Sequence, residues 1–166
     1  MALSAAQLQS LWRDLIDRDA GRAYRALWQI ALSPKHALPF LAEHLRPASP
    51  LDKAQQQRVD RLLTDLDSEH FTVRQDAEAA LEKLGLVVEP ALRKALESKP
   101  SLEMRRRIET VLAKLANERL RITRALEALE HMNAPEARRL VEALANGAPR
   151  AWLTEEARAI RKRLDR

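Results

Sequence analysis

Residues 73–84 have the sequence VRQDAEAALEKL, and residues 104–115, which begin 31 positions later, have the related sequence MRRRIETVLAKL. In both stretches the apolar residues are three or four positions apart, the spacing that places side chains on one face of an α-helix. A fixed period of about 31 residues in helix-forming sequence is typical of stacked helical repeats. The two stretches therefore predict an all-α protein, arranged as an α-solenoid.

The same apolar spacing extends along most of the chain and predicts further helices. Ser4 with Gln7 and Thr72 with Gln75 fit the capping box, which marks the start of a helix. Ser33 and Ser49 each precede a proline, which suits the first helical turn. The predicted helices cover residues 4–16, 19–32, 35–45, 51–66, 71–84, 87–97, 101–116, 118–131, 134–146 and 154–164.

The segment Arg46-Pro47-Ala48-Ser49-Pro50 cannot continue a helix because it contains two prolines. We interpret residues 46–50 as a turn within one domain and not as a domain boundary. The sequence thus predicts a single domain over residues 1–166, with about four helical hairpins. The basic helix at 154–164 is expected to cap the stack, because a terminal repeat needs a polar outer face.

Composition excludes several classes of site. The chain has no cysteine, so it has no disulfide, thiolate metal site or cysteine nucleophile. Its three glycines leave no room for a phosphate-binding glycine loop. No apolar run reaches the roughly 18 residues of a membrane span. We therefore expect a cytoplasmic protein with no membrane segment and no cofactor.

Short motifs resemble the HEAT repeats of the bacterial lyase-like subfamily. The matching residues are Leu66-Asp67, Val73-Arg74, Ala77, Leu81, Leu84-Gly85, Pro90-Ala91-Leu92 and Leu96. More narrowly, residues 11–45 and 133–140 resemble the HEAT module that follows WD40 propellers in large bacterial proteins. The resemblance implies a right-handed superhelix of helical hairpins used for protein–protein contact. It implies no lyase activity, because the sequence offers no matching catalytic residue.

The repeated arginines Arg74 and Arg105 precede buried positions by three and seven residues, so both are expected beside the apolar face. A buried arginine needs a partner, and Asp67 is the candidate for Arg74. Structural pairing is favoured over ligand contact. Successive helical residues point about 100° apart, so in Arg105-Arg106-Arg107 only Arg106 is expected to face solvent clearly.

The favoured function is a non-enzymatic scaffold that presents the charged faces of its second helices to a protein partner, such as a WD40 propeller in the same or another chain. Second helices line the concave side of HEAT-like stacks. The residues expected to bind the partner are Glu89, Arg93, Lys94, Arg121 and Arg124. The alternative is electrostatic binding of nucleic acid, which the net charge of +5 permits. Acidic residues interrupt the basic ones on these helices, so this alternative is not favoured.

An enzyme is the least favoured reading. HEAT-like alkylpurine DNA glycosylases use aromatic and carboxylate residues, and here Asp14 and Asp17 lie near Trp12. The aspartates follow a stripe expected to be partly buried, and Trp12 itself is expected in the core. Metal binding is also disfavoured, because Glu127 with His131 supplies two ligands where a zinc site needs at least three.

Overall fold

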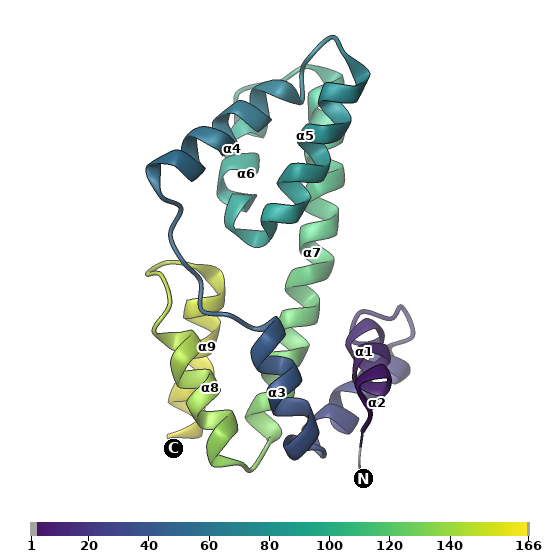
Figure 1. The fold of residues 1–166 in the computed structure, drawn as a ribbon, viewed down its shortest axis with the longest axis vertical. Helices are drawn as coiled ribbons and strands as arrows, with labels where there is room; N and C mark the ends of the chain where they lie inside the picture. Colours follow the sequence, from purple (N-terminus) through teal and green to yellow (C-terminus); the bar gives the residue numbers. More distant parts are fainter. Residues whose placement is uncertain (1–2, 166) are drawn as a thin grey trace. The chain divides into compact units, whose positions relative to one another are not determined.

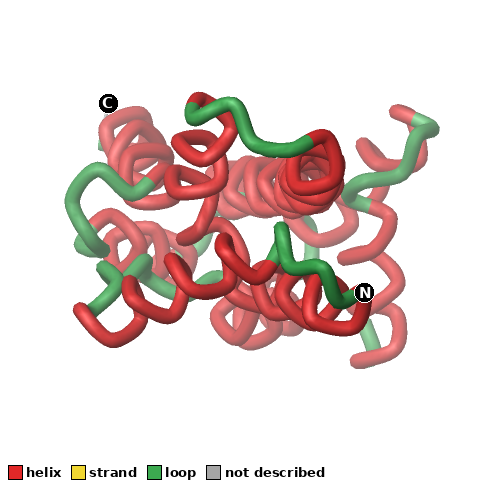
Figure 2. The backbone as a smooth tube through the Cα atoms, turned by 90° about the horizontal axis from the view of Figure 1, so that it is seen from above, coloured by secondary structure: helices red, strands yellow, loops and turns green. Residues whose placement is uncertain are grey.

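The computed structural model describes residues 3–165, and its regular elements are helices (Figures 1 and 2). In chain order they are α1 (Ala5–Asp14), α2 (Ala20–Ala31), α3 (Pro34–His44), α4 (Lys53–Asp65), α5 (Phe71–Leu84), the 3₁₀ helix η1 (Gly85–Val88), α6 (Glu89–Glu97), α7 (Leu102–His131), α8 (Pro135–Ala145) and α9 (Trp152–Leu164). No strand occurs among residues 3–165, so the prediction of an all-α protein is confirmed.

The helix boundaries agree with the sequence-based ones to within two residues, with one exception. The helices predicted at 101–116 and 118–131 are a single helix, α7. The residues at the expected break, Ala116 and Asn117, include neither glycine nor proline, and asparagine costs a helix interior only a fraction of a kcal/mol. Nothing in the local sequence therefore ends the helix there.

The capping residues were only partly predicted. Ser4 caps α1, and its Oγ accepts a hydrogen bond from the backbone N of Gln7 at 3.3 Å. Helix α4 is capped by Asp52 and not by Ser49, because the Asp52 carboxylate accepts from the backbone N of Gln55 at 2.7 Å. Helix α5 begins after His70, so Thr72 lies inside its first turn and the capping box predicted there is wrong.

The described residues form two compact units. Unit 1 includes residues 3–49 and 120–165, and unit 2 consists of residues 50–119. The chain first passes from unit 1 to unit 2 after Ser49. This point lies in the non-helical segment that was predicted as a turn at 46–50. A single domain over residues 1–166 stays a prediction.

Unit 2 is built around one apolar cluster from α4, α5, η1, α6 and the first part of α7. The fully or nearly fully buried members are Val59, Leu66, Ala77, Leu81, Val88, Leu92, Ile108, Val111 and Leu115. Ala77 and Leu81 come from the first copy of the repeated sequence, and Ile108 and Leu115 from the second. Both copies thus contribute an apolar stripe to one core, although Leu112, the counterpart of Leu81, is only partly buried.

Three ion pairs join α5 to the first part of α7 in a regular order. Arg74 lies 3.4 Å from Glu103, Glu78 lies 2.8 Å from Arg107, and Glu82 pairs with Lys114. The partners advance along both helices in the same direction, so these two helical segments run parallel. Their separations in sequence, 29 to 32 residues, match the repeat period. Within unit 2 the two copies of the repeat therefore lie in parallel helices that are joined at separations close to the repeat period.

Two expectations about the repeated arginines are wrong. Arg74 is partly buried as expected, but it donates to the carbonyls of Ser68 and Glu69 and pairs with Glu103. Asp67 instead accepts a hydrogen bond from Ser101, the residue before α7. Arg105 is exposed, and Arg107 is the arginine that faces α5. When the two repeated sequences are aligned, α7 is therefore rotated about its axis relative to α5. Because of this rotation, position 107 and not position 105 faces the neighbouring helix.

Unit 1 brings together the first three helices, the second part of α7, and the last two helices. Helix α9 packs along α8, and α3 contacts α1, α2 and α8 (Figure 1). In a linear solenoid each repeat contacts only its neighbours in sequence. The contact between α3 and α8 joins segments about 100 residues apart in sequence. Unit 1 is therefore a helical bundle in which early and late helices of the chain pack together.

A close backbone contact closes unit 1 near Gly147. The backbone N of Ala148 donates to the carbonyl of Ala48 at 2.7 Å. A Cβ at Gly147 would lie 2.6 Å from Oγ1 of the buried Thr154 and 2.9 Å from the backbone N of Ala48. Only glycine fits between these two segments.

We expect Gly147→Ala to destabilise the protein by about 1–3 kcal/mol, because overpacking forces backbone or side chains to shift. Urea unfolding followed by circular dichroism measures this change. Gly21→Ala is the matched control, because its Cβ would meet only side-chain atoms, of Asp19 and Arg25, at 3.2 and 3.3 Å. Equal stability of the two variants would contradict the packing argument.

Helix α9 is tied to α7 within unit 1 by a bidentate ion pair. Arg163 donates to both carboxylate oxygens of Glu130, at 2.5 and 2.6 Å. These hydrogen bonds from Arg163 are the main reason why the pKa of Glu130 is lower than its ordinary value of 4.5.

Because folding lowers the pKa of Glu130, the pair stabilises the protein above about pH 4.5 and the contribution is lost as the pH falls through the lowered value. Glu130→Gln should therefore unfold at lower urea concentration than wild type at pH 7, and this difference should shrink by pH 3. Glu142→Gln, at an exposed position with no ion pair among the described residues, should show no such difference. A Glu130→Gln deficit of equal size at both pH values would contradict the assignment.

Candidate protein-docking groove

Helix α3 has a buried face and an open face. Ser33 precedes Pro34, whose fixed φ suits the first helical position. Ala37, Leu41 and the following Leu45 are fully buried in unit 1. Leu38 lies one position from this stripe and is only partly buried, which places an apolar side chain at the edge of the core.

Helix α8 has the same organisation. It also begins with a proline, Pro135, and its buried residues are Ala137, Val141, Leu144 and Ala145. Leu140 lies beside this stripe and is half-buried. In Figure 1, α3 and α8 lie side by side and both begin at the lower end of the view.

An open hollow of about 570 Å³ lies between these two helices. Its lining residues are Pro34, Lys35, Leu38, Pro39, Ala42, Ala134, Glu136 and Leu140. Six of these eight side chains are apolar. All of them belong to unit 1, and we call this feature the α3–α8 groove.

The two charged residues of the groove differ in their surroundings. The carboxylate of Glu136 lies 2.7 Å from the guanidinium of Arg139, one turn along α8. Lys35 is exposed and has no ion pair among the described residues. The charge of the groove that is not paired with a nearby opposite charge is therefore the positive charge of Lys35.

The same sign holds for unit 1 as a whole. Fifteen basic and eleven acidic residues belong to the described part of unit 1, whereas unit 2 has thirteen of each. The excess of positive charge therefore resides on the unit that contains the groove.

The residues predicted to bind a partner divide between the two units. Glu89, Arg93 and Lys94 are in unit 2, on α6. Glu89 is buried, lies 2.7 Å from Arg93 and also pairs with Arg119 of α7. Its carboxylate thus fixes α6 to α7 within unit 2. Arg93 and Lys94 remain exposed to solvent.

Arg121 and Arg124 are in unit 1, on α7. Arg124 donates to the carbonyl of Leu15, at the C-terminal end of α1, and so satisfies a group that the helix leaves unpaired. The guanidinium of Arg121 lies 5.7 Å from the ring centre of Trp12. Trp12 is buried, as predicted. Both arginines are half-buried and attach α1 to α7.

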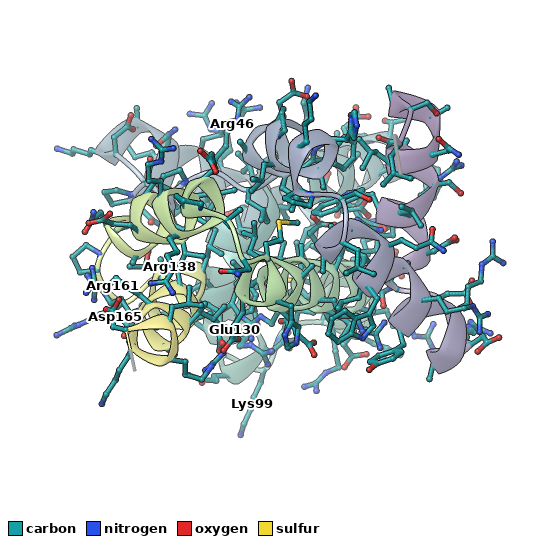
Figure 3. The ribbon with its side chains drawn as sticks, turned by 90° about the horizontal axis from the view of Figure 1, so that it is seen from below. Arg46, Lys99, Glu130, Arg138, Arg161 and Asp165 are labelled. Carbon is teal, nitrogen blue, oxygen red and sulfur yellow. The ribbon has the colours of Figure 1, made fainter. Side chains whose placement is uncertain are left out.

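A second hollow, of about 450 Å³, lies between α8 and α9. Arg138, Arg161 and Asp165, which are labelled in Figure 3, line it together with Glu142, Val141 and Leu164. Two guanidinium groups and two carboxylates line the hollow, so the charges balance. This balance favours neither an anionic nor a cationic ligand.

The carboxylates considered for catalysis are engaged in ion pairs. Asp14 and Asp17 lie 3.2 and 3.4 Å from the guanidinium of Arg22 on α2. Within residues 3–165, no three histidine or acidic side chains are grouped closely enough to hold a metal ion. No helix in the described part of the chain is long and apolar enough to span a membrane.

Sequence reasoning missed the α3–α8 groove. The signal in the sequence was a leucine one position away from each buried stripe, Leu38 beside Ala37 and Leu140 beside Val141. Such a leucine is ordinary at the edge of a core. Only the contact between helices about 100 residues apart places the two leucines in one groove.

Comparisons of the chain with protein-family models, with curated proteins and with solved structures give no match.

Glu89→Ala should destabilise the protein by about 1–3 kcal/mol, because it removes the buried carboxylate that binds both Arg93 of α6 and Arg119 of α7. Thermal and urea unfolding measure the loss. Lys94→Ala, on the exposed side of the same helix, should change stability by less than about 0.5 kcal/mol. Equal effects of the two variants would remove the structural role assigned to Glu89.

Proposed function

We propose that this chain is a non-enzymatic protein-binding module, and that the α3–α8 groove is its docking surface. The observation that supports this proposal is an open groove on unit 1 that is lined by six apolar side chains. Exposed contiguous apolar surface on a folded protein commonly marks a site of protein contact.

The groove does not contain the second-helix residues that the sequence analysis expected to bind a partner. Helix α3 follows α2 and packs against it, whereas α8 packs closely against α9, which follows it. The proposal therefore keeps the protein-binding role expected from the sequence but places the docking surface in the α3–α8 groove. Glu89, Arg121 and Arg124 make contacts between helices within the fold. Arg93 and Lys94 stay proposed contacts for a partner on unit 2.

A HEAT-like arrangement is part of the proposal for unit 2. Parallel packing of α5 and α7 with the repeat period supports stacked hairpins there. In this reading α6 is the second helix of the hairpin that α5 begins. A superhelical stack of hairpins within unit 2, a WD40 propeller as the partner and a cytoplasmic location are further proposals, for which the sequence resemblance and the lack of cysteine are the support.

The alternative, electrostatic binding of nucleic acid, has less support. Several arginines that would contact phosphates are paired with carboxylates: Arg22, Arg74, Arg107, Arg139, Arg158 and Arg163. A nonspecific duplex binder needs several basic groups free to release counterions from the phosphates. The groove itself is apolar and would offer a phosphate little.

Selection of peptides from a displayed random library on the full chain tests the proposed function. We expect enriched peptides that bind the wild-type chain and lose at least tenfold in affinity for Leu38→Glu, measured by fluorescence anisotropy. Leu38 is only partly buried, so the variant is expected to fold, which circular dichroism checks.

Gln57→Glu is the matched control, because it adds the same charge at an exposed position of α4 in unit 2. Peptides that bind wild type and Leu38→Glu equally would overturn the groove as the docking surface, and an empty selection would overturn the proposed function. A labelled DNA duplex at 50 and 200 mM salt tests the alternative. Tight binding that weakens steeply with salt would favour nucleic acid.

A further inference from the structure

The shape of the α3–α8 groove restricts its ligand. The hollow is open to solvent along two helices, whereas sites for small molecules enclose most of the ligand surface. A groove between two helices can take the apolar side chains of a third helix, whose anchors lie at positions i, i+3, i+4 and i+7. Leu38 on one wall and Leu140 on the other are the contacts for such anchors.

The charges around the groove determine which sign of charge is favoured at the polar positions of that ligand helix. Lys35 is the charged lining residue with no ion pair among the described residues, and Glu136 is neutralised by Arg139. Helix α3 has no acidic residue in its first turn, so the partial positive charge of its N-terminus adds to that of Lys35. The net charge of unit 1 has the same sign. A ligand with carboxylates beside its apolar anchors is therefore favoured over a basic one.

We propose that the α3–α8 groove binds an acidic amphipathic helix of a partner protein. This inference rests on the proposed function and names the chemistry of its partner. The apolar face of the partner helix contacts Leu38, Pro39 and Leu140, and a carboxylate at the edge of that face lies near Lys35. Contact with a second copy of this chain is disfavoured, because it would bring two positively charged units together.

Two synthetic helical peptides of 18 residues provide the test. Both have leucine at the same i, i+3, i+4 and i+7 positions, and their polar positions are glutamate in one and lysine in the other. We expect the glutamate peptide to bind the full chain at least tenfold more tightly than the lysine peptide, by fluorescence anisotropy at 50 mM salt. The preference should weaken at 200 mM salt, because rim charges are screened.

Variants locate the binding. Leu140→Glu should weaken binding of the glutamate peptide at least tenfold. Lys35→Glu should weaken it about three- to tenfold and should improve binding of the lysine peptide. Lys53→Glu is the matched control, because it changes the net charge equally at an exposed position in unit 2, and it should leave both affinities unchanged.

Equal binding of the two peptides, or no binding of the glutamate peptide at millimolar concentration, would overturn the inference. Loss of binding in Lys53→Glu but not in Lys35→Glu would also overturn it and would move the site to unit 2. The library selection separates this failure from failure of the proposed function. Selected peptides that depend on Leu38 but lack acidic residues would keep the protein-binding module and reject the acidic partner.

Discussion

Burial of one apolar stripe on each helix is the constraint on which the rest of this structure depends. Short helices are marginally stable alone, so each one must bury its apolar face against another. In unit 2, Ala77 and Leu81 of α5 share a core with Ile108 and Leu115 of α7. In unit 1, Leu41 and Leu144 are fully buried in the same way. Once the stripes are buried, the positions of all other side chains follow.

The many arginines of the chain are understood from this arrangement. An arginine next to a buried stripe has its stem against the core and its guanidinium within reach of a neighbouring helix. Arg107 thus reaches Glu78, Arg124 reaches the carbonyl of Leu15, and Arg163 reaches Glu130. These contacts join helices within each unit, so arginines beside a buried stripe here serve helix pairing. It is a poor indicator of nucleic-acid binding.

The α3–α8 groove follows from the same constraint. Pro34 and Pro135 start two helices whose buried stripes face the core of unit 1, and each helix has one leucine outside its stripe. When the two helices pack side by side, Leu38 and Leu140 flank a hollow that neither helix fills. The groove is thus a product of packing, and the exposed Lys35 at its edge has no ion pair among the described residues.

The sequence by itself determined the helices, because apolar spacing, prolines and capping residues act over a few neighbouring positions. It located the ends of α5 and α8 well, and it failed at residues 116–118 because no local signal separates the two halves of α7. Which side chains meet was decided only by the tertiary structure. The partner of Arg74, the exchange of Arg105 for Arg107, the burial of Glu89 and the groove between α3 and α8 all depend on contacts between segments distant in sequence. Such contacts depend on helix phase and packing geometry, and a change of one residue in phase rotates a side chain by about 100°.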